Sequence, residues 1–187
     1  MTTSAAAGTL QLYLGELRQL FDSLDPAPFR ERDLDPKAAE YIVDSAREAP
    51  AGAALALQVQ LGREPASAAA AALLRDAVRE YFERRAASRR RELRLLFRRG
   101  RLSLLIGVVF LAATLALAQW LGELTEPVGY AKLVIESLII AAWVALWVPA
   151  EIFLYEWWPI LADAKLFDRL AAMPVSLVDS ADRGSRE

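Results

Sequence analysis

An arginine-rich stretch that runs without a helix breaker into a long apolar segment constrains this chain more than any other feature. Nine arginines fall between residues 84 and 101, and residues 102–121 then contain no charged side chain. A bilayer core about 30 Å thick is crossed by roughly 20 apolar helical residues. Because arginines beside such a segment stay on the cytoplasmic side, the pattern predicts an integral membrane protein with residues 1–101 in the cytoplasm.

The amino-acid composition excludes several kinds of functional site. It has no cysteine and no histidine among its 187 residues, which excludes disulfides, thiolate zinc sites, cysteine nucleophiles and histidine-based triads. No site combines a nucleophile with a base, and no glycine-rich phosphate loop is present. We therefore expect a protein that is not an enzyme and has no cofactor and no bound metal.

The first part of the chain has the pattern of a small α/β domain. Two stretches alternate apolar and polar residues and predict strands at Thr9–Leu14 and Ala54–Leu61. Helical spacing of apolar residues predicts helices from Leu17 to Leu24 and from Pro36 to Glu48, the second with Asp35 as its N-cap. The expected fold class is an α+β membrane protein with a βααβ cytoplasmic domain.

The rest of the chain predicts a long basic stalk helix that continues into a two-helix transmembrane hairpin. From Ser67, a candidate N-cap, we expect one continuous helix to Trp120, because a single glycine costs a helix only about 1 kcal/mol. After the hairpin, Leu166, Phe167 and Leu170 are expected on the membrane surface or the stalk. The predicted segments are a cytoplasmic α/β domain at 1–66, the stalk at 67–101, transmembrane helices at 102–121 and 133–158 around an outer loop at 122–132, and a cytoplasmic amphipathic segment and tail at 159–187.

The second apolar segment carries an acidic and aromatic stripe. Glu136 lies about one turn inside it, and at 100° per residue Trp143, Trp147 and Glu151 project near the same helical face. A carboxylate at membrane depth faces protein or water rather than lipid. Repeated around a symmetry axis, Glu136 would form an acidic ring of the kind that cation channels use.

Both carboxylates of the stripe also have structural interpretations. Glu136 lies four residues after Lys132, so the two side chains can pair on one helical face. Glu151 follows Pro149 and is placed to pair with a stalk arginine at the cytoplasmic interface.

The stalk arginines set the orientation and are expected to bind anionic lipid headgroups, at about 1 kcal/mol for each basic residue near the surface. Nucleic acid is not an expected partner, because the cluster lies beside the bilayer and contains one aromatic residue, Phe97. The headgroup-binding candidates are Arg89, Arg90, Arg91, Arg94, Arg98, Arg99 and Arg101. In the acidic loop Asp25–Asp35, arginines alternate with carboxylates, which favours salt bridges and helix caps over a metal site.

Two segments, DPAPFRERDLD (25–35) and WVALWVPAEIFLYEWWP (143–159), resemble a family of uncharacterised bacterial two-helix inner-membrane proteins. The resemblance covers most of the chain and implies two membrane helices, but no activity. The layout of α/β domain, long helix, short outer loop and second helix is also similar to that of CorA-type magnesium channels. Their Gly-Met-Asn signature is absent from residues 122–131.

The outer loop, Glu123-Leu-Thr-Glu126-Pro-Val-Gly-Tyr130, is similar to the Asp-x-x-Glu-Pro-Val-x-Tyr pore signature of mitochondrial-type calcium uniporters. That resemblance implies stacked cation-binding rings formed by Glu123 and Glu126. The sequence departs from the signature in three places: glutamate replaces the aspartate, Gly122 replaces the preceding tryptophan, and Lys132 lies where a cation path would continue.

The sequence thus predicts a homo-oligomer in a bacterial inner membrane with both termini cytoplasmic, because neither two strands nor a lone hairpin buries its own surface well. Two functions remain open. One is an oligomeric cation channel or transporter lined by Glu136, Glu123 and Glu126. The other is a membrane-anchored scaffold whose cytoplasmic domain binds another protein while the hairpin only anchors it.

Overall fold

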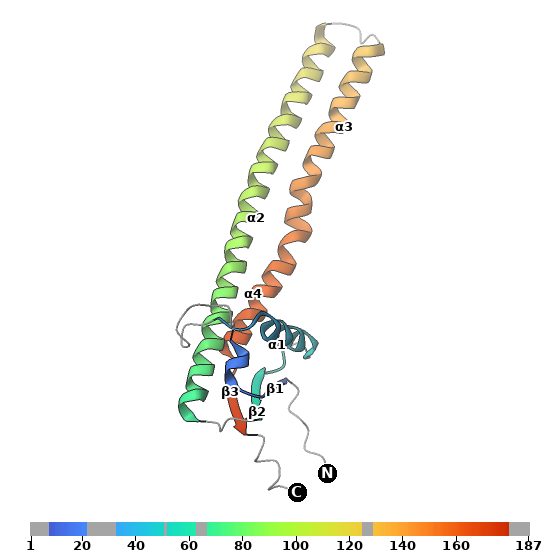
Figure 1. Cartoon of the computed structure of the whole chain (residues 1–187). Helices are drawn as coiled ribbons and strands as arrows, with labels where there is room; N and C mark the ends of the chain where they lie inside the picture. The colour runs from blue at the N-terminus through green and yellow to red at the C-terminus, as the bar shows by residue number, and fades with distance from the viewer. Residues whose placement is uncertain (1–7, 22–32, 51, 63–66, 125–128, 180–187) are drawn as a thin grey trace. The chain divides into compact units, whose positions relative to one another are not determined.

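The computed structural model describes residues 8–21, 33–50, 52–62, 67–124 and 129–179 (Figure 1). The chain divides into two compact units. An α/β unit is made of Met1–Ser88 and Asp163–Glu187, and a hairpin unit is made of Arg89–Ala162.

The α/β unit is built on a parallel three-stranded sheet in the order β1-β2-β3. The strands are β1 (Thr9–Leu14), β2 (Ala56–Leu61) and β3 (Val175–Asp179). Leu10 pairs in register with Leu57, which pairs with Val175, so apolar residues of all three strands form one row. The two strands expected from sequence are confirmed within two residues, and they pair within one chain.

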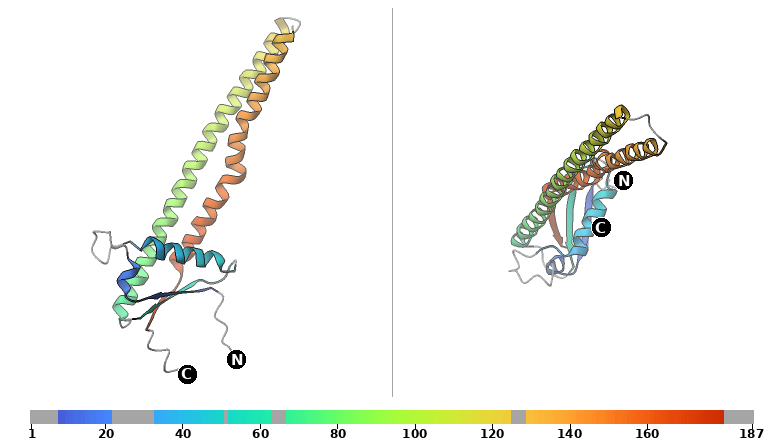
Figure 2. Two further views of the ribbon diagram at one scale, coloured as in Figure 1. Left: turned by 45° about the vertical axis from the view of Figure 1, so that its right-hand side comes forward. Right: turned by 90° about the horizontal axis from the view of Figure 1, so that it is seen from above.

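Three helical segments cover the apolar face of this sheet, and Figure 2 shows α1 (Pro36–Glu48) lying across it. The other two are the start of α2 (Ala68–Leu124) and the end of α4 (Trp157–Ala172). The core joins strand residues to one or more residues of each helix: Leu57, Val59, Ile42, Leu74, Val78, Phe82, Phe167 and Leu170. The rings of Phe82 and Phe167 stack at 6.2 Å between centroids, so α2 and α4 are packed directly together.

Helix starts follow the capping chemistry of the sequence. The Asp35 carboxylate accepts hydrogen bonds from the backbone N–H groups of Lys37 and Ala38, and Pro36 is the first helical residue, as expected. The Ser67 hydroxyl accepts a bond from the N–H of Ala70 at 3.1 Å. Both predicted N-caps are confirmed.

Two expectations about this unit are wrong. The helix expected from Leu17 to Leu24 is instead the short 3-10 helix η1 (Leu17–Leu20), and Leu24 lies outside the described residues. It ends because Phe21 takes an extended conformation and forms an antiparallel bridge with Leu34. The fold is therefore not βααβ.

The second correction concerns the segment after residue 159, which was expected on the membrane surface or the stalk. Its residues form α4 and then β3, and Phe167, Leu170, Met173 and Val175 are buried in the core of the α/β unit. The segment is amphipathic, as its sequence predicts, but its apolar face covers the sheet. Residues from Ser180 onward lie outside the described residues.

The hairpin unit consists of the later part of α2, then α3 (Gly129–Glu151), a π-helical turn η2 (Ile152–Glu156) and the start of α4. The continuous helix expected from Ser67 is confirmed, and Gly100 does not interrupt it. Among the described residues, two helices are long and apolar enough to cross a membrane, with mean hydropathies of 2.2 and 2.1 in their most apolar windows.

Candidate functional site: an acidic stripe on α3 and an arginine groove on α2

Small residues are buried where α2 and α3 face each other in the hairpin. Gly100, Gly107 and Thr114 are buried at intervals of seven on α2, and Ala142 and Pro149 are buried at the same interval on α3. A Cβ on Gly107 would meet the Leu146 Cδ2 atom at 2.9 Å, so the helices approach closely here. Seven-residue spacing of small residues is typical of left-handed helix pairs in close contact.

The acidic stripe lies on the opposite side of α3, away from α2. Glu136 and Glu151 are exposed, and the indoles of Trp143 and Trp147 are 68% and 72% exposed. The four residues thus lie on one unpartnered face, as the helical period predicts. The same face also presents the bulky apolar side chain of Ile140.

Neither carboxylate of the stripe is paired with the partner that the sequence suggested. No ion pair joins Glu136 to Lys132, although both lie in the described part of α3. Nor does any described arginine of α2 form an ion pair with Glu151. Both carboxylates therefore keep their acceptor capacity for groups outside the single chain.

The two acids of the outer loop are not placed with this stripe. Glu126 lies outside the described residues. The backbone of Glu123 belongs to the last turn of α2, and its side chain lies outside the described part of the structure. The stacked rings implied by the uniporter-like signature remain a prediction.

Pro149 lies inside α3, and the π-helical turn η2 begins three residues after it. Proline removes a backbone donor, and π-helical turns insert an extra residue into a helix, which rotates the side chains that follow. The Trp157 indole N–H donates to the Phe153 carbonyl oxygen at 2.9 Å across this turn. The turn thus places Phe153 and Trp157 against α2, where their rings lie 6.1 and 6.4 Å from that of Phe97.

The arginines of α2 differ in their partners. Arg84 forms an ion pair with Asp33, Arg85 donates two hydrogen bonds to the Tyr81 hydroxyl, and Arg89 donates to Glu92 at 2.8 Å. Further along the helix, no hydrogen bond or ion pair within the described ranges is made by the side chains of four arginines: Arg91, Arg94, Arg98 and Arg101.

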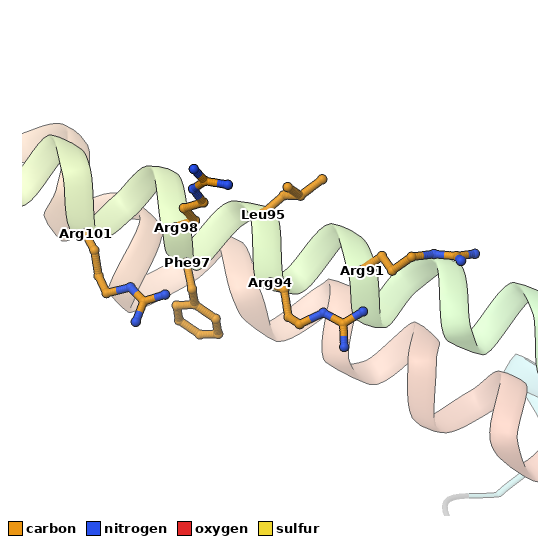
Figure 3. Close-up of a pocket in the computed structure, with 6 residues that line it drawn as sticks. All are labelled: Arg91, Arg94, Leu95, Phe97, Arg98 and Arg101. Atoms are coloured by element: carbon orange, nitrogen blue, oxygen red, sulfur yellow. The ribbon is translucent and has the colours of Figure 1, made fainter.

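These four arginines line a groove of about 730 Å³ together with Leu95 and Phe97. Figure 3 shows Arg94, Phe97 and Arg101 leaving α2 on the same side, in agreement with their spacing of three and four residues. The groove thus combines cationic walls with an aromatic floor. Of the other headgroup candidates, Arg90 is exposed, and Arg99 lines a separate groove beside Glu156.

Sequence reasoning missed the aromatic cluster of Phe97, Phe153 and Trp157, because only tertiary packing brings residues so distant in the chain together. It also missed β3, for which the alternating Val175-Ser-Leu-Val that follows Pro174 was an available signal. Comparison of the chain with protein-family models, with curated proteins and with solved structures gives no match.

Proposed function

We propose that this protein is a two-span integral membrane protein of a bacterial inner membrane that assembles from several copies and conducts cations along the stripe of α3. Its two long apolar helices support the spans. The arginines at residues 84–101 support an orientation with both termini in the cytoplasm.

An exposed carboxylate on the outer face of the hairpin supports assembly from several copies. Glu136 lies within the apolar part of α3 and is exposed on the single chain. A carboxylate at such a depth is costly in lipid and nearly always faces protein or a water-filled space. Further copies of the chain, arranged by cyclic symmetry, would remove the stripe from lipid.

The observation that carries the proposal for conduction is the contrast between the two sides of α3. Its inner side packs closely against α2, where Gly107 meets Leu146 and where Ala142 is buried. The acidic side chains lie on the outer side. A cation path must therefore run between copies, where Glu136 residues would form a ring with Trp143 and Trp147 below it.

Cation flux into liposomes tests this proposal. The purified full chain is reconstituted, and flux of a monovalent and a divalent cation is followed with indicator dyes. We expect flux above that of empty liposomes and a decrease of about ten-fold in E136Q, because the ring loses its charge. The matched control is E156Q, which removes an exposed carboxylate outside the apolar part of α3 and should leave flux within about two-fold of the wild type. Wild-type flux no greater than that of empty liposomes contradicts conduction.

A second candidate function is a membrane-tethered interaction module, and one feature of the sheet favours it. All-parallel sheets occur almost only with both faces covered. Here the face away from the helices carries polar residues, with Gln11, Gln58 and Ser176 in register, and Tyr13 is 59% exposed beside them. A photo-crosslinking amino acid at position 13 should then join the chain to a different protein in intact cells. Crosslinks only to further copies of this chain contradict that function.

A further inference from the structure

Four of the stalk arginines line the groove on α2, namely Arg91, Arg94, Arg98 and Arg101. Several stalk arginines before residue 91 are bound to groups of the chain itself: Arg84 to Asp33, Arg85 to Tyr81 and Arg89 to Glu92. The four arginines that line the groove have no such partner within the described residues. Each guanidinium group offers five N–H donors in a fixed planar fork, which fits the oxygens of a phosphate.

The floor of the groove is apolar, and this restricts the anion that fits. Phe97 is the aromatic residue that lines the groove, and outside the groove its ring is supported by contacts with Phe153 and Trp157. A small soluble phosphate would contact the cationic walls and leave this aromatic floor in water. A ligand with a phosphate joined to a hydrocarbon part would use both.

The packing of the hairpin holds this floor in place. A Cβ on Gly100 would come within 2.8 Å of the Ile152 Cγ2 atom and 3.3 Å of the Phe153 ring, so only glycine lets η2 approach α2 so closely. The hydrogen bond from the Trp157 indole to the Phe153 carbonyl then fixes the second ring. The floor is therefore preorganised, which lowers the entropic cost of binding.

The position of the groove along the chain indicates where the ligand comes from. Arg101 directly precedes the uncharged segment 102–121. On the second arm of the hairpin, Trp157 lies beside Phe97 and Trp158 lies beside Trp157, and Tyr155 is two residues before Trp157 in the sequence. Tyrosine and tryptophan concentrate at the headgroup level of bilayers, and basic residues there attract anionic lipids.

We propose that this groove is a binding site for a single anionic phospholipid. The phosphate oxygens accept hydrogen bonds from Arg94 and Arg101, with Arg91 and Arg98 adding positive charge at the rim. Phe97 contacts the glycerol and the first acyl carbons. The proposal rests on the membrane location given above, and it does not depend on cation conduction.

Lipid binding by the full chain in detergent micelles tests the site. The protein is titrated with phosphatidylglycerol or phosphatidylcholine, and bound lipids are counted by native mass spectrometry. We expect one phosphatidylglycerol to be retained at concentrations where phosphatidylcholine is not. The double variant R94Q/R101Q should weaken this binding by about ten-fold or more, since each basic residue near a headgroup contributes about five-fold.

The matched control is R90Q/R99Q, which removes the same charge from the same stretch of helix but no wall of the groove. It should weaken phosphatidylglycerol binding by no more than about three-fold. Equal losses in the two double variants would show a diffuse attraction to the whole basic stretch and would overturn the site. F97A, which keeps every charge, should also weaken binding, and unchanged binding in F97A contradicts the role of the floor.

A soluble competitor distinguishes the two sources of phosphate. Glycerol 1-phosphate has the charged group without the acyl chains, and we expect it to leave bound phosphatidylglycerol in place at millimolar concentration. Displacement by glycerol 1-phosphate at micromolar concentration would assign the groove to a soluble ligand and overturn the lipid proposal.

A wrong membrane location and a wrong lipid site would give different experimental results. A protein that stays monodisperse after detergent is removed is not an integral membrane protein, whatever it binds. A detergent-dependent protein that binds phosphatidylglycerol no better than phosphatidylcholine leaves the membrane location intact and overturns only the lipid site.

Discussion

Gly107 of α2 lies so close to Leu146 of α3 that a Cβ atom on the glycine would come within 2.9 Å of the leucine Cδ2 atom. This contact lies at the middle of the buried series Gly100, Gly107 and Thr114. Close approach of this kind increases the dispersion contacts between the two helices.

The first prediction follows from that contact. A leucine at position 107 should destabilise the hairpin by about 1–3 kcal/mol, because there is no space for the added carbons. Unfolding of the full chain by a denaturing detergent, followed by tryptophan fluorescence, measures the change. The control is Ala113→Leu, at an exposed position of α2, where we expect little effect. Equal stability of the two variants would contradict close packing at Gly107.

The second prediction concerns the C-terminal helix. Leu170 of α4 is fully buried in the core of the α/β unit, so Leu170→Ala should cost about 2–5 kcal/mol of that unit's stability. Lys165→Ala, on the exposed side of the same helix, should change stability by less than about 0.5 kcal/mol. Hydrogen exchange of the amides of β2 in the full chain reports the difference. Unchanged protection of β2 in L170A would show that α4 does not stabilise the sheet.

The third prediction tests the cap of α1. Asp35→Ala removes the acceptor of two backbone bonds and should cost about 1 kcal/mol, seen as faster hydrogen exchange in the first turn of α1. Glu40→Ala changes an exposed carboxylate within the same helix and should leave that turn protected. If both variants exchange alike, the carboxylate of Asp35 does not hold the helix start.

The fourth prediction concerns orientation, and the absence of cysteine makes it simple to test because every introduced thiol is unique. Tyr130→Cys, at a position that is 85% exposed near the start of α3, should react with a membrane-impermeant maleimide added outside intact spheroplasts. Ser176→Cys, on β3, should react only after the membrane is opened. Labelling of Ser176→Cys from outside would reverse the proposed orientation.

The fifth prediction concerns assembly through the stripe. If α3 faces a symmetry axis, Trp143→Cys should form disulfide-linked dimers in native membranes under mild oxidation, because equivalent residues meet near the axis. Val109→Cys, on the exposed face of α2, is the control and should cross-link far less. Equal cross-linking at both positions, or none at either, would contradict a stripe that faces its own copies.

Local physics explains which parts of this fold were predictable from sequence. The start of helix α1 was predicted to the residue because Asp35-Pro36 fixes it, and its regular apolar period predicted an end near Glu48. Helix α2 was predictable because no proline interrupts residues 68–124. The helical period alone also placed Glu136, Trp143, Trp147 and Glu151 on one face of α3.

The remaining features depend on contacts between distant residues. The five residues of β3 pair with β2 across the intervening residues 62–174, and no local signal sets such a parallel pairing. Likewise, the arginines of α2 are alike in sequence, and only their tertiary surroundings distinguish Arg84, which reaches Asp33, from Arg94, which reaches no acceptor in the described part of the chain. The expected helix after Leu17 failed for the same reason, since the bridge of Phe21 with Leu34 competes with it.

The connection between β2 and β3 has a consequence for biosynthesis. Strands β2 and β3 are neighbours in the sheet, but the whole hairpin lies between them in the sequence. The last strand therefore leaves the ribosome only after both long helices have been made. Until then β2 has an open edge, and unpaired edges invite aggregation. A nascent chain that stalls before residue 175 therefore exposes an incomplete sheet with one edge of β2 unpaired.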